Sequence, residues 1–307
     1  MLAILFKTLP FFALIALGYW AGRTRFFTQE ATAYLTKFVF YFALSAMIFR
    51  FAANLELAEV WDINLVLAYL SGTVVVYLIA TSVGMIRRLD MPTTAVEAQC
   101  AVIGNAGFLG LPMLGLLFGP QAIGPVMLVL ATDLILFSSL IVILISIGRD
   151  GRMSWGVLRT IPLGLVKNPM VVAMSLGLIW SGFNIPIPEP MNDFLAILGG
   201  AATPGALFAI GASLASKSAE RLPIASWLSF CKLVLHPAAV AISALLIFQV
   251  DPFGAAMIIA CAAMPVAGNI YMLAQHYGVA PQRVSAAILV STALSIVSLT
   301  AVIAWIS

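Results

Sequence analysis

Apolar stretches of about twenty residues, separated by short polar breaks, dominate this sequence. A hydrocarbon core of about 30 Å needs roughly 20 apolar residues per spanning helix, and a backbone in lipid must satisfy its own hydrogen bonds. Hydrophobic residues make up 63% of the chain and charged residues only 9%, so no stretch is left for a soluble domain. The pattern predicts an all-α integral membrane protein whose surroundings are the lipid bilayer, and it excludes a nucleic-acid partner.

Ten spanning helices are predicted. Their expected ranges are 3–22, 31–53, 64–86, 94–117, 121–147, 166–184, 191–215, 225–248, 253–277 and 283–306. The first range contains Lys7 and lacks a small-residue cleavage pattern. It is therefore expected to be a retained helix rather than a signal peptide.

Charged residues between the helices predict the orientation. Basic residues follow the odd-numbered helices, and they are Arg23, Arg25, Arg87, Arg88, Arg149, Arg152, Arg159, Lys167, Lys217, Arg221 and Arg283. Acidic residues follow the even-numbered helices, and they are Glu56, Glu59, Asp62, Glu189, Asp193 and Asp251. By the positive-inside rule, the odd connections face the cytoplasm and both chain termini face outward across the inner (cell) membrane.

The two halves of the chain share short matches at one spacing of 159 residues. "GYWAG" (18–22) matches "GLIWSG" (177–182), and "LSAMIF" (44–49) matches "TPGALF" (203–208). These matches predict a first five-helix repeat over 1–148, a cytoplasmic connection over 149–165 and a second repeat over 166–307. Because five is odd, the second repeat is inverted, as in secondary transporters. Coincidence among apolar strings is the alternative.

Helices four and nine each contain residues that break a helix. Helix four reads "GNAGFLGLP" (104–112), and helix nine reads "AAMPVAGN" (262–269). Proline lacks an amide hydrogen, and glycine lowers the cost of leaving helical geometry. A break in lipid persists only where it is buried or lines a cavity, so two breaks in equivalent helices are expected to cross at mid-membrane.

Such a crossing favours an anion site. Half-helix N-termini attract negative charge, and Asn105 and Asn269 would add donors and acceptors, provided that a gap of a few residues aligns the two asparagines. The expected substrate-binding residues are Gly104, Asn105, Gly107, Pro112, Pro265, Gly268 and Asn269. The alternative is that the glycines permit close helix packing and the asparagines only join neighbouring helices.

At these residues the chain resembles the auxin efflux carrier family, which includes plant PIN-type carriers and bacterial transporters of malonate- and malate-like acids. The resemblance spans the whole chain and includes "TPGALFAIGASLA" (203–215) and "CKLVLHP" (231–237). It implies the crossover-helix fold of NhaA-type antiporters and bile-acid sodium symporters. Helices 1, 2, 6 and 7 would form a scaffold, which suggests a homodimer, and helices 3–5 and 8–10 a sliding transport domain. Ser45 replaces a proline common in relatives, so the two scaffold kinks need not be symmetric.

Three ionisable residues lie deep within predicted helices. Asp133 in helix five and Lys232 in helix eight could form a structural ion pair, or one of them could carry a coupling proton. His236 is either a packing residue or a proton relay. Glu97 completes "TAVE" (94–97), which has the spacing of a capping box at the start of helix four.

Enzymatic function is not expected, because two separated histidines and three scattered cysteines give no metal-ligand spacing, and no cofactor or metal is predicted. No channel filter motif occurs either. We expect a secondary active or potential-driven carrier of a small organic anion, either an auxin-like monocarboxylate or a malonate/malate-like dicarboxylate, with elevator-type alternating access. The coupling ion, proton or sodium, stays open. A sodium/proton or sodium-coupled transporter of the same fold is the alternative, although neither Glu97 nor Asp133 is adjacent to the breaks in sequence.

Overall fold

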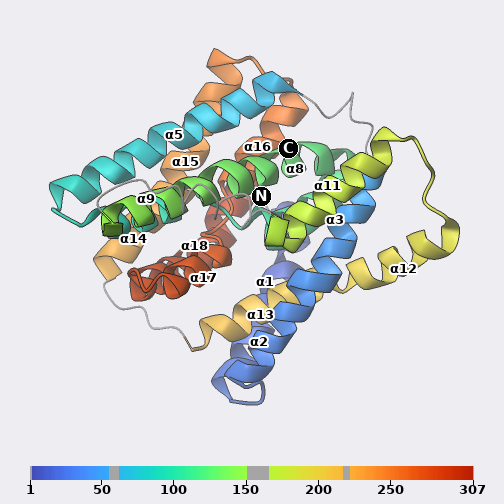
Figure 1. The fold of residues 1–307 in the computed structure, drawn as a ribbon, viewed down its shortest axis with the longest axis horizontal. Coiled ribbons are helices and arrows are strands. Elements are labelled where there is room, and N and C mark those ends of the chain that lie inside the picture. The colour runs from blue at the N-terminus through green and yellow to red at the C-terminus, as the bar shows by residue number, and fades with distance from the viewer. Residues whose placement is uncertain (1, 55–61, 151–165, 217–221, 307) are drawn as a thin grey trace.

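The computed structural model describes residues 2–54, 62–150, 166–216 and 222–306 (Figure 1). Within these ranges the chain is helical, with one isolated antiparallel bridge between Gly104 and Val266. The predicted connection lies outside the described residues from 151 to 165. So do the charged residues Glu56, Glu59, Arg152, Arg159, Lys217 and Arg221, on which the orientation partly rests.

Each predicted range contains helix, with ends that differ by a few residues. The first half contains α1 (Leu2–Arg23), α2 (Gln29–Phe38), η1 (Val39–Ala43), α3 (Leu44–Ala53), α5 (Ile63–Ile86), α6 (Met91–Val102), η2 (Ala106–Gly110), α7 (Leu111–Phe118), η3 (Pro120–Ala122), α8 (Ile123–Thr132), η4 (Asp133–Phe137) and α9 (Ser138–Asp150). The second half contains α11 (Pro169–Gly182), α12 (Glu189–Gly200), α13 (Ala202–Leu214), α14 (Leu222–Phe230), η5 (Cys231–Leu235), α15 (His236–Ile242), η6 (Ser243–Ile247), α16 (Pro252–Ala262), α17 (Gly268–His276) and α18 (Pro281–Ile306).

Several of these elements join into longer helices. Among the described residues, six stretches are long and apolar enough to cross a membrane: Gln29–Ala53, Ile63–Ile86, Pro120–Arg149, Glu189–Leu214, Leu222–Ile247 and Pro281–Ile306. Five π-helical turns, η1, η2, η4, η5 and η6, lie within or beside these helices. Such turns often mark functional sites.

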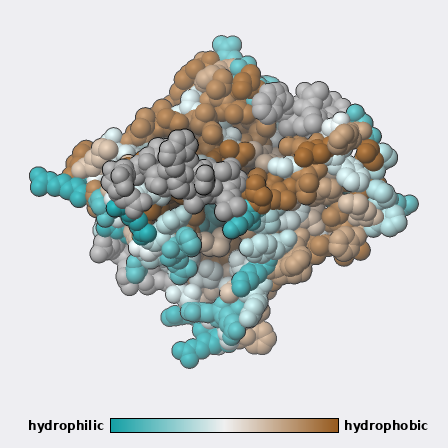
Figure 2. Space-filling model, viewed as in Figure 1, coloured by the Kyte–Doolittle hydropathy of each residue, from teal (hydrophilic) through white to brown (hydrophobic). Residues whose placement is uncertain are grey.

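Large apolar side chains cover much of the outer surface. On α5, Val75 is 51% exposed and Leu78 57% exposed, which would be costly in water and is expected in contact with lipid tails. Figure 2 shows apolar residues spread over the face in view, with polar residues gathered mainly at its lower and left edges. Length, composition and surface together identify a multi-pass helical membrane protein.

Aspartate and asparagine side chains define where helices begin. Asp62, Asp90, Asn168 and Asp251 each accept a hydrogen bond from a backbone N–H in the first turn of the helix that follows. The hydrogen bonds from Thr93 hold the pKa of the Asp90 carboxyl below its usual value. Because Asp90 caps α6, the capping-box prediction for Glu97 is wrong: the helix begins before "TAVE", and Glu97 lies in its middle.

The helices pack in two groups. One group contains α1, α2, α3, α11, α12 and α13, and the other contains α5, α6, α9 and α14 to α18. Figure 1 shows α2, α3, α12 and α13 on one side and α5, α14, α15 and α17 on the other. The assignment of the first group as a scaffold and of the second as a transport domain stays a prediction.

Glycines permit backbone contact within the first group. A Cβ on Gly18 would lie 2.1 Å from the carbonyl oxygen of Phe208, and a Cβ on Gly177 would lie 2.8 Å from that of Phe49. Gly18 and Gly177, like Phe49 and Phe208, are separated by the spacing of 159 residues found between the matched motifs. Helix one therefore packs on helix seven much as helix six packs on helix two, through small residues of the kind that join helices in membranes.

We predict that Gly211→Ala strongly destabilises the protein. A Cβ at Gly211 would lie 1.9 Å from the carbonyl oxygen of Ile15, so α1 and α13 would have to separate. Overpacking of this kind costs about 3 kcal/mol. Gly200→Ala is the matched control, because nothing lies within 4 Å of its added Cβ. Thermal unfolding in detergent should show a lower midpoint for Gly211→Ala alone, and equal midpoints would contradict the packing argument.

Candidate functional site

The two helix breaks lie side by side in the structure. The Asn105 N–H donates to the carbonyl oxygen of Pro265 at 2.8 Å, and the Ala267 N–H donates to that of Ile103 at 3.1 Å. Each break therefore supplies backbone partners that the other lacks. Because unsatisfied backbone groups in lipid cost several kcal/mol each, this mutual pairing explains how both breaks persist.

The residues of the two motifs have different roles at the crossing. A Cβ on Gly104 would lie 3.0 Å from the carbonyl oxygen of Cys261 and 3.1 Å from Lys232 Nζ, so glycine permits this close approach. Gly107 faces the Met170 methyl group, whereas nothing lies within 4 Å of a Cβ on Gly268. Pro112 lies beyond the break, in the first turn of α7.

The two asparagines do not occupy equivalent positions. The two backbone hydrogen bonds of the crossing pair Ile103 with Ala267 and Asn105 with Pro265. A shift of 162 residues turns Ile103 into Pro265 and Asn105 into Ala267, so it exchanges the two hydrogen bonds. In this relation Ala267 is the counterpart of Asn105. The local symmetry of this bridge therefore does not pair Asn105 with Asn269, and the alignment of the two repeats stays a prediction. Asn105 directly precedes η2, while Asn269 is the second residue of α17.

Both asparagines nevertheless face the same space. Asn269 lines three cavities of about 610, 120 and 50 Å³, and Asn105 lines the two smaller ones. We call the largest the vestibule and the smallest the crossing cavity. The Asn269 Oδ1 is buried without a hydrogen-bond partner. Gly104, Gly107 and Gly268 also line the crossing cavity, so five of the seven predicted site residues meet there.

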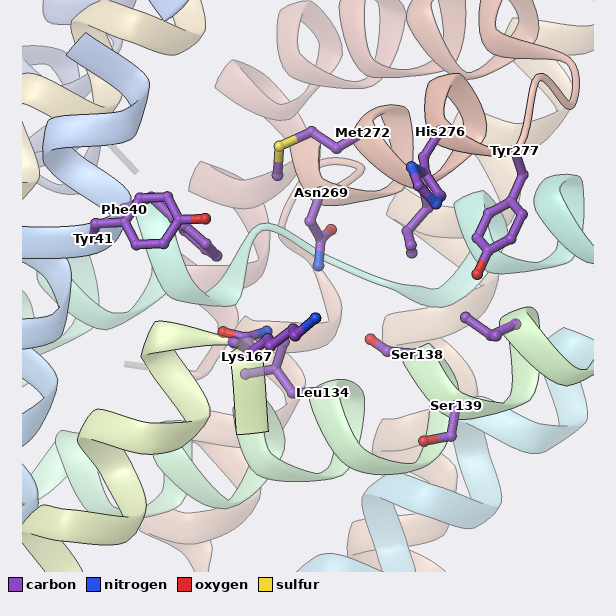
Figure 3. Close-up of a pocket in the computed structure, with 13 residues that line it drawn as sticks. Phe40, Tyr41, Leu134, Ser138, Ser139, Lys167, Asn269, Met272, His276 and Tyr277 are labelled. Carbon is purple, nitrogen blue, oxygen red and sulfur yellow. The ribbon is translucent and has the colours of Figure 1, made fainter. Parts of the chain in front are cut away.

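The vestibule extends from the crossing between the two packing groups. Phe40 and Tyr41 of η1 line one side, and Ser138 of α9 and His276 of α17 line the other. Figure 3 shows Asn269 and Lys167 extending toward the same space from different segments. Lys167 is exposed and gives the vestibule a positive charge. In the sequence, Lys167 contributed only to the predicted orientation, and no sequence signal indicated that it lines the vestibule.

Asp133 lies at the crossing as well. It is 4% exposed, and Asp133 Oδ1 accepts a hydrogen bond from the Tyr69 hydroxyl at 2.9 Å. Asp133 Oδ2 has no hydrogen-bond partner, and the residue lines the crossing cavity with Gly104 and Asn105. Asp133 is not adjacent to the glycine-proline motifs in sequence, but the fold brings η4 beside both breaks.

Lys232 lies beside Gly104 at the crossing, and His236 contacts Lys232. Both residues are fully buried. The Lys232 ammonium donates to the carbonyl oxygen of Ala262 and contacts His236 Nδ1 at 3.0 Å. Since an ammonium group can only donate, Nδ1 accepts and Nε2 carries the hydrogen. His236 Nε2 then donates to Thr73 Oγ1 at 2.9 Å. Among the described residues, Asp133 and Lys232 form no direct ion pair, which corrects one of the two predicted arrangements.

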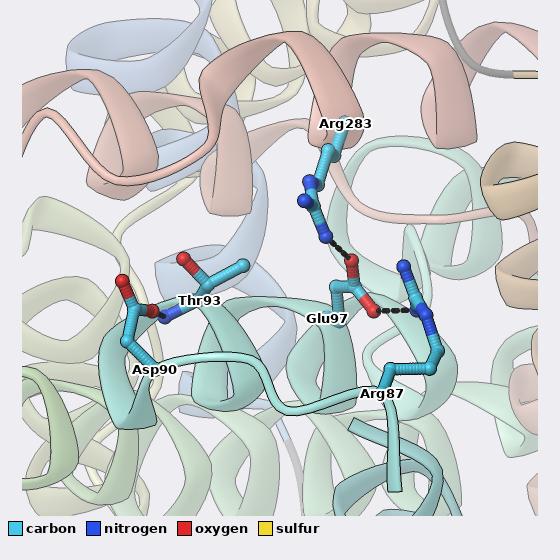
Figure 4. Close-up of polar contacts among 5 residues, drawn as sticks. All are labelled: Arg87, Asp90, Thr93, Glu97 and Arg283. Atoms are coloured by element: carbon cyan, nitrogen blue, oxygen red, sulfur yellow. Dashed lines mark hydrogen bonds and ion pairs between the residues drawn. The ribbon is translucent and has the colours of Figure 1, made fainter. Parts of the chain in front are cut away.

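Glu97 instead forms the ion pairs. Its carboxylate accepts from Arg87 at 2.6 Å and from Arg283, while Glu97 itself is only 2% exposed (Figure 4). These contacts join the end of α5, the middle of α6 and the start of α18. They lie beside the predicted cytoplasmic connections, and Glu97 precedes the first break by about two turns of α6.

Comparisons with known proteins agree with this architecture. A family model described as "Membrane transport protein" matches residues 3–303. A Rhizobium meliloti (strain 1021) protein named "Putative malonate transporter" is 28% identical over 298 residues, which cover 95% of this chain and 92% of the relative. An uncharacterized transporter of Methanothermobacter thermautotrophicus is 28% identical over 293 residues, 93% of each chain. The uncharacterized transporter YfdV of Escherichia coli (strain K12) is 27% identical over 240 residues, 75% of each chain. All these names point to transport rather than catalysis.

Proposed function

The chain belongs to the membrane transport protein family, as the resemblance to auxin efflux carriers predicted, and we propose that it is a secondary carrier of a small organic anion. The observation that carries this proposal is the crossing itself. Two broken helices pair through their backbones, and Asn105 and Asn269 both line the same two cavities. Half-helix ends and neutral amide groups at mid-membrane suit a carboxylate better than a metal cation.

The charge of the vestibule favours a dicarboxylate. One carboxylate would bind at Asn105 and Asn269, and a second would reach toward Lys167, which lines the vestibule together with Asn269. The name of the Rhizobium meliloti relative agrees with a small dianion of this kind. A monocarboxylate would leave Lys167 without a counter-charge, so we place malonate-like acids first.

Transport would proceed by an elevator-type motion. The vestibule lies between the two packing groups, with η1 from one group and α9 and α17 from the other. Sliding of the second group against the first would move the crossing from one side of the membrane to the other. By the positive-inside rule, the basic residues favour a vestibule that opens toward the cytoplasmic side of the inner membrane, with both termini outside and the first group available for a homodimer.

Thermal unfolding of the detergent-purified protein tests the proposal. The ligands are malonate, malate, succinate, lactate, indole-3-acetate, sodium chloride and lithium chloride. A ligand that binds only the folded state raises apparent stability by RT ln(1 + [L]/Kd), so weak sites show at millimolar concentrations. We expect stabilisation by a dicarboxylate. Stabilisation by sodium or lithium alone would favour the sodium-coupled alternative, for which the supporting observation is the buried, unpartnered Oδ2 of Asp133, a residue that lines the crossing cavity.

Lys167→Gln is expected to lower the affinity for malonate about tenfold, because a hydrogen bond to a charged group contributes about 1.5 kcal/mol. Lactate affinity should hardly change, since lactate has no second carboxylate. Competition of each acid against labelled malonate uptake measures both effects. Lys37→Gln is the matched control, because Lys37 is exposed on α2 and lies over the ring of Tyr34. An equal loss for both acids would argue against a role in recognising the second carboxylate.

A further inference from the structure

We propose that Asp133 is the proton-coupling residue of this carrier, which binds a proton together with the anion and carries both across the membrane in the same direction. The inference rests on the proposed function and adds the identity of the coupling ion and its site.

Geometry singles out Asp133. It is 4% exposed, yet its Oδ2 has no hydrogen-bond partner and the residue lines the crossing cavity. Its other oxygen is held by the Tyr69 hydroxyl at 2.9 Å. The carboxyl group is thus held through one oxygen, while its other oxygen is buried without a partner in a residue that lines the cavity proposed to hold the substrate.

The groups around Asp133 determine whether a bound proton favours or opposes binding of the anion. Tyr69 faces it from α5, Lys232 from η5 and Cys261 from α16, and His236 of α15 contacts Lys232 in turn. With Asp133 ionised, its charge and that of Lys232 cancel, and an arriving anion leaves the crossing negative. With Asp133 protonated, the positive charge of Lys232 faces the anion. Anion and proton therefore favour each other's binding, and this linkage is reciprocal.

A proton fits this site better than a sodium ion. A bound sodium ion would place a second positive charge near Lys232, whose ammonium group donates to the Ala262 carbonyl beside the second break. A proton needs one acceptor atom only. In the step, hydronium in the crossing cavity gives a proton to Asp133 Oδ2, an O–H bond forms and water remains. After the crossing has moved, the same bond breaks and water takes the proton.

The test uses proteoliposomes that contain the full chain, labelled malonate outside and a pH-sensitive dye inside. The membrane potential is clamped to zero with valinomycin and equal potassium concentrations on both sides. Both compartments are kept at a pH above the second pKa of malonate. The variants are Asp133→Asn, which cannot ionise, and Asp193→Asn as the matched control on an exposed face of α12.

We expect malonate entry into wild-type vesicles to acidify the lumen, and a gradient of about one pH unit to accumulate malonate about tenfold. Asp193→Asn should behave identically. Asp133→Asn should still be stabilised by malonate and exchange it, with no acidification and no accumulation.

Malonate entry without acidification in the wild type would overturn the inference, and this arm holds even if Asp133→Asn proves unstable. Unchanged tenfold accumulation by Asp133→Asn would overturn it too, as would accumulation driven by a sodium gradient instead. If no acid binds the wild type at all, the proposed function itself fails, which is a distinct outcome.

Discussion

Replacing Asn105 by alanine is expected to abolish malonate transport while leaving the fold intact. The Asn105 side chain lines both smaller cavities, and losing a hydrogen bond to a charged ligand costs about 3 kcal/mol, or about 100-fold in affinity. The break should survive, because Asn105 holds it through its backbone: its N–H donates to Pro265, and its carbonyl oxygen accepts from Leu109 and Gly110.

Two measurements check this expectation. Uptake of labelled malonate into proteoliposomes should fall to the level of empty vesicles, and the stabilisation of the purified variant by malonate should disappear. Its unfolding midpoint without ligand and its elution profile should match those of Asn64→Ala, a control at an exposed position of α5. Normal transport by monodisperse Asn105→Ala would show that the substrate binds elsewhere.

Local signals in the sequence predicted the helices and both breaks. Apolar stretches of about twenty residues, and proline together with glycine, determine the local backbone conformation directly. Ranges such as 64–86 and the break before Asn105 could therefore be predicted without knowledge of the fold. The π-helical turns carry no such signal. Val39–Ala43 and Asp133–Phe137 are ordinary apolar sequence apart from Asp133, yet they place Phe40 and Asp133 at the crossing.

The main errors in the predictions from sequence concerned contacts between residues that are distant in the chain. A direct ion pair between Asp133 and Lys232 was one of the two predicted arrangements. Instead, Asp133 accepts a hydrogen bond from Tyr69 of α5, and Lys232 donates to the Ala262 carbonyl beside the second break. Sequence shows that a buried charge needs compensation, and a hydroxyl or a backbone carbonyl compensates as well as an opposite charge. Which of them is near depends on packing between helices far apart in the chain.

The partners of Glu97 could not be predicted from sequence either, and replacing Glu97 is expected to have a second large effect. Its partner Arg283 lies 186 residues away in the chain, so the spacing of "TAVE" could suggest only a local role. Glu97→Ala would leave Arg87 and Arg283 without their shared carboxylate. Removing one partner of a buried pair costs about 3–5 kcal/mol, so we expect the largest fall in unfolding midpoint of any single acidic residue outside the crossing.

Glu189→Ala, at an exposed position in the first turn of α12, is the control for this effect. Equal midpoints for the two variants would mean that water or lipid headgroups replace the carboxylate at little cost. A selective fall would have a mechanistic consequence. The pairs join α5, α6 and α18, all within the group that is proposed to slide. An elevator can move its substrate site only if that group stays one rigid body, so Glu97→Ala at permissive temperature should also slow transport without weakening malonate binding.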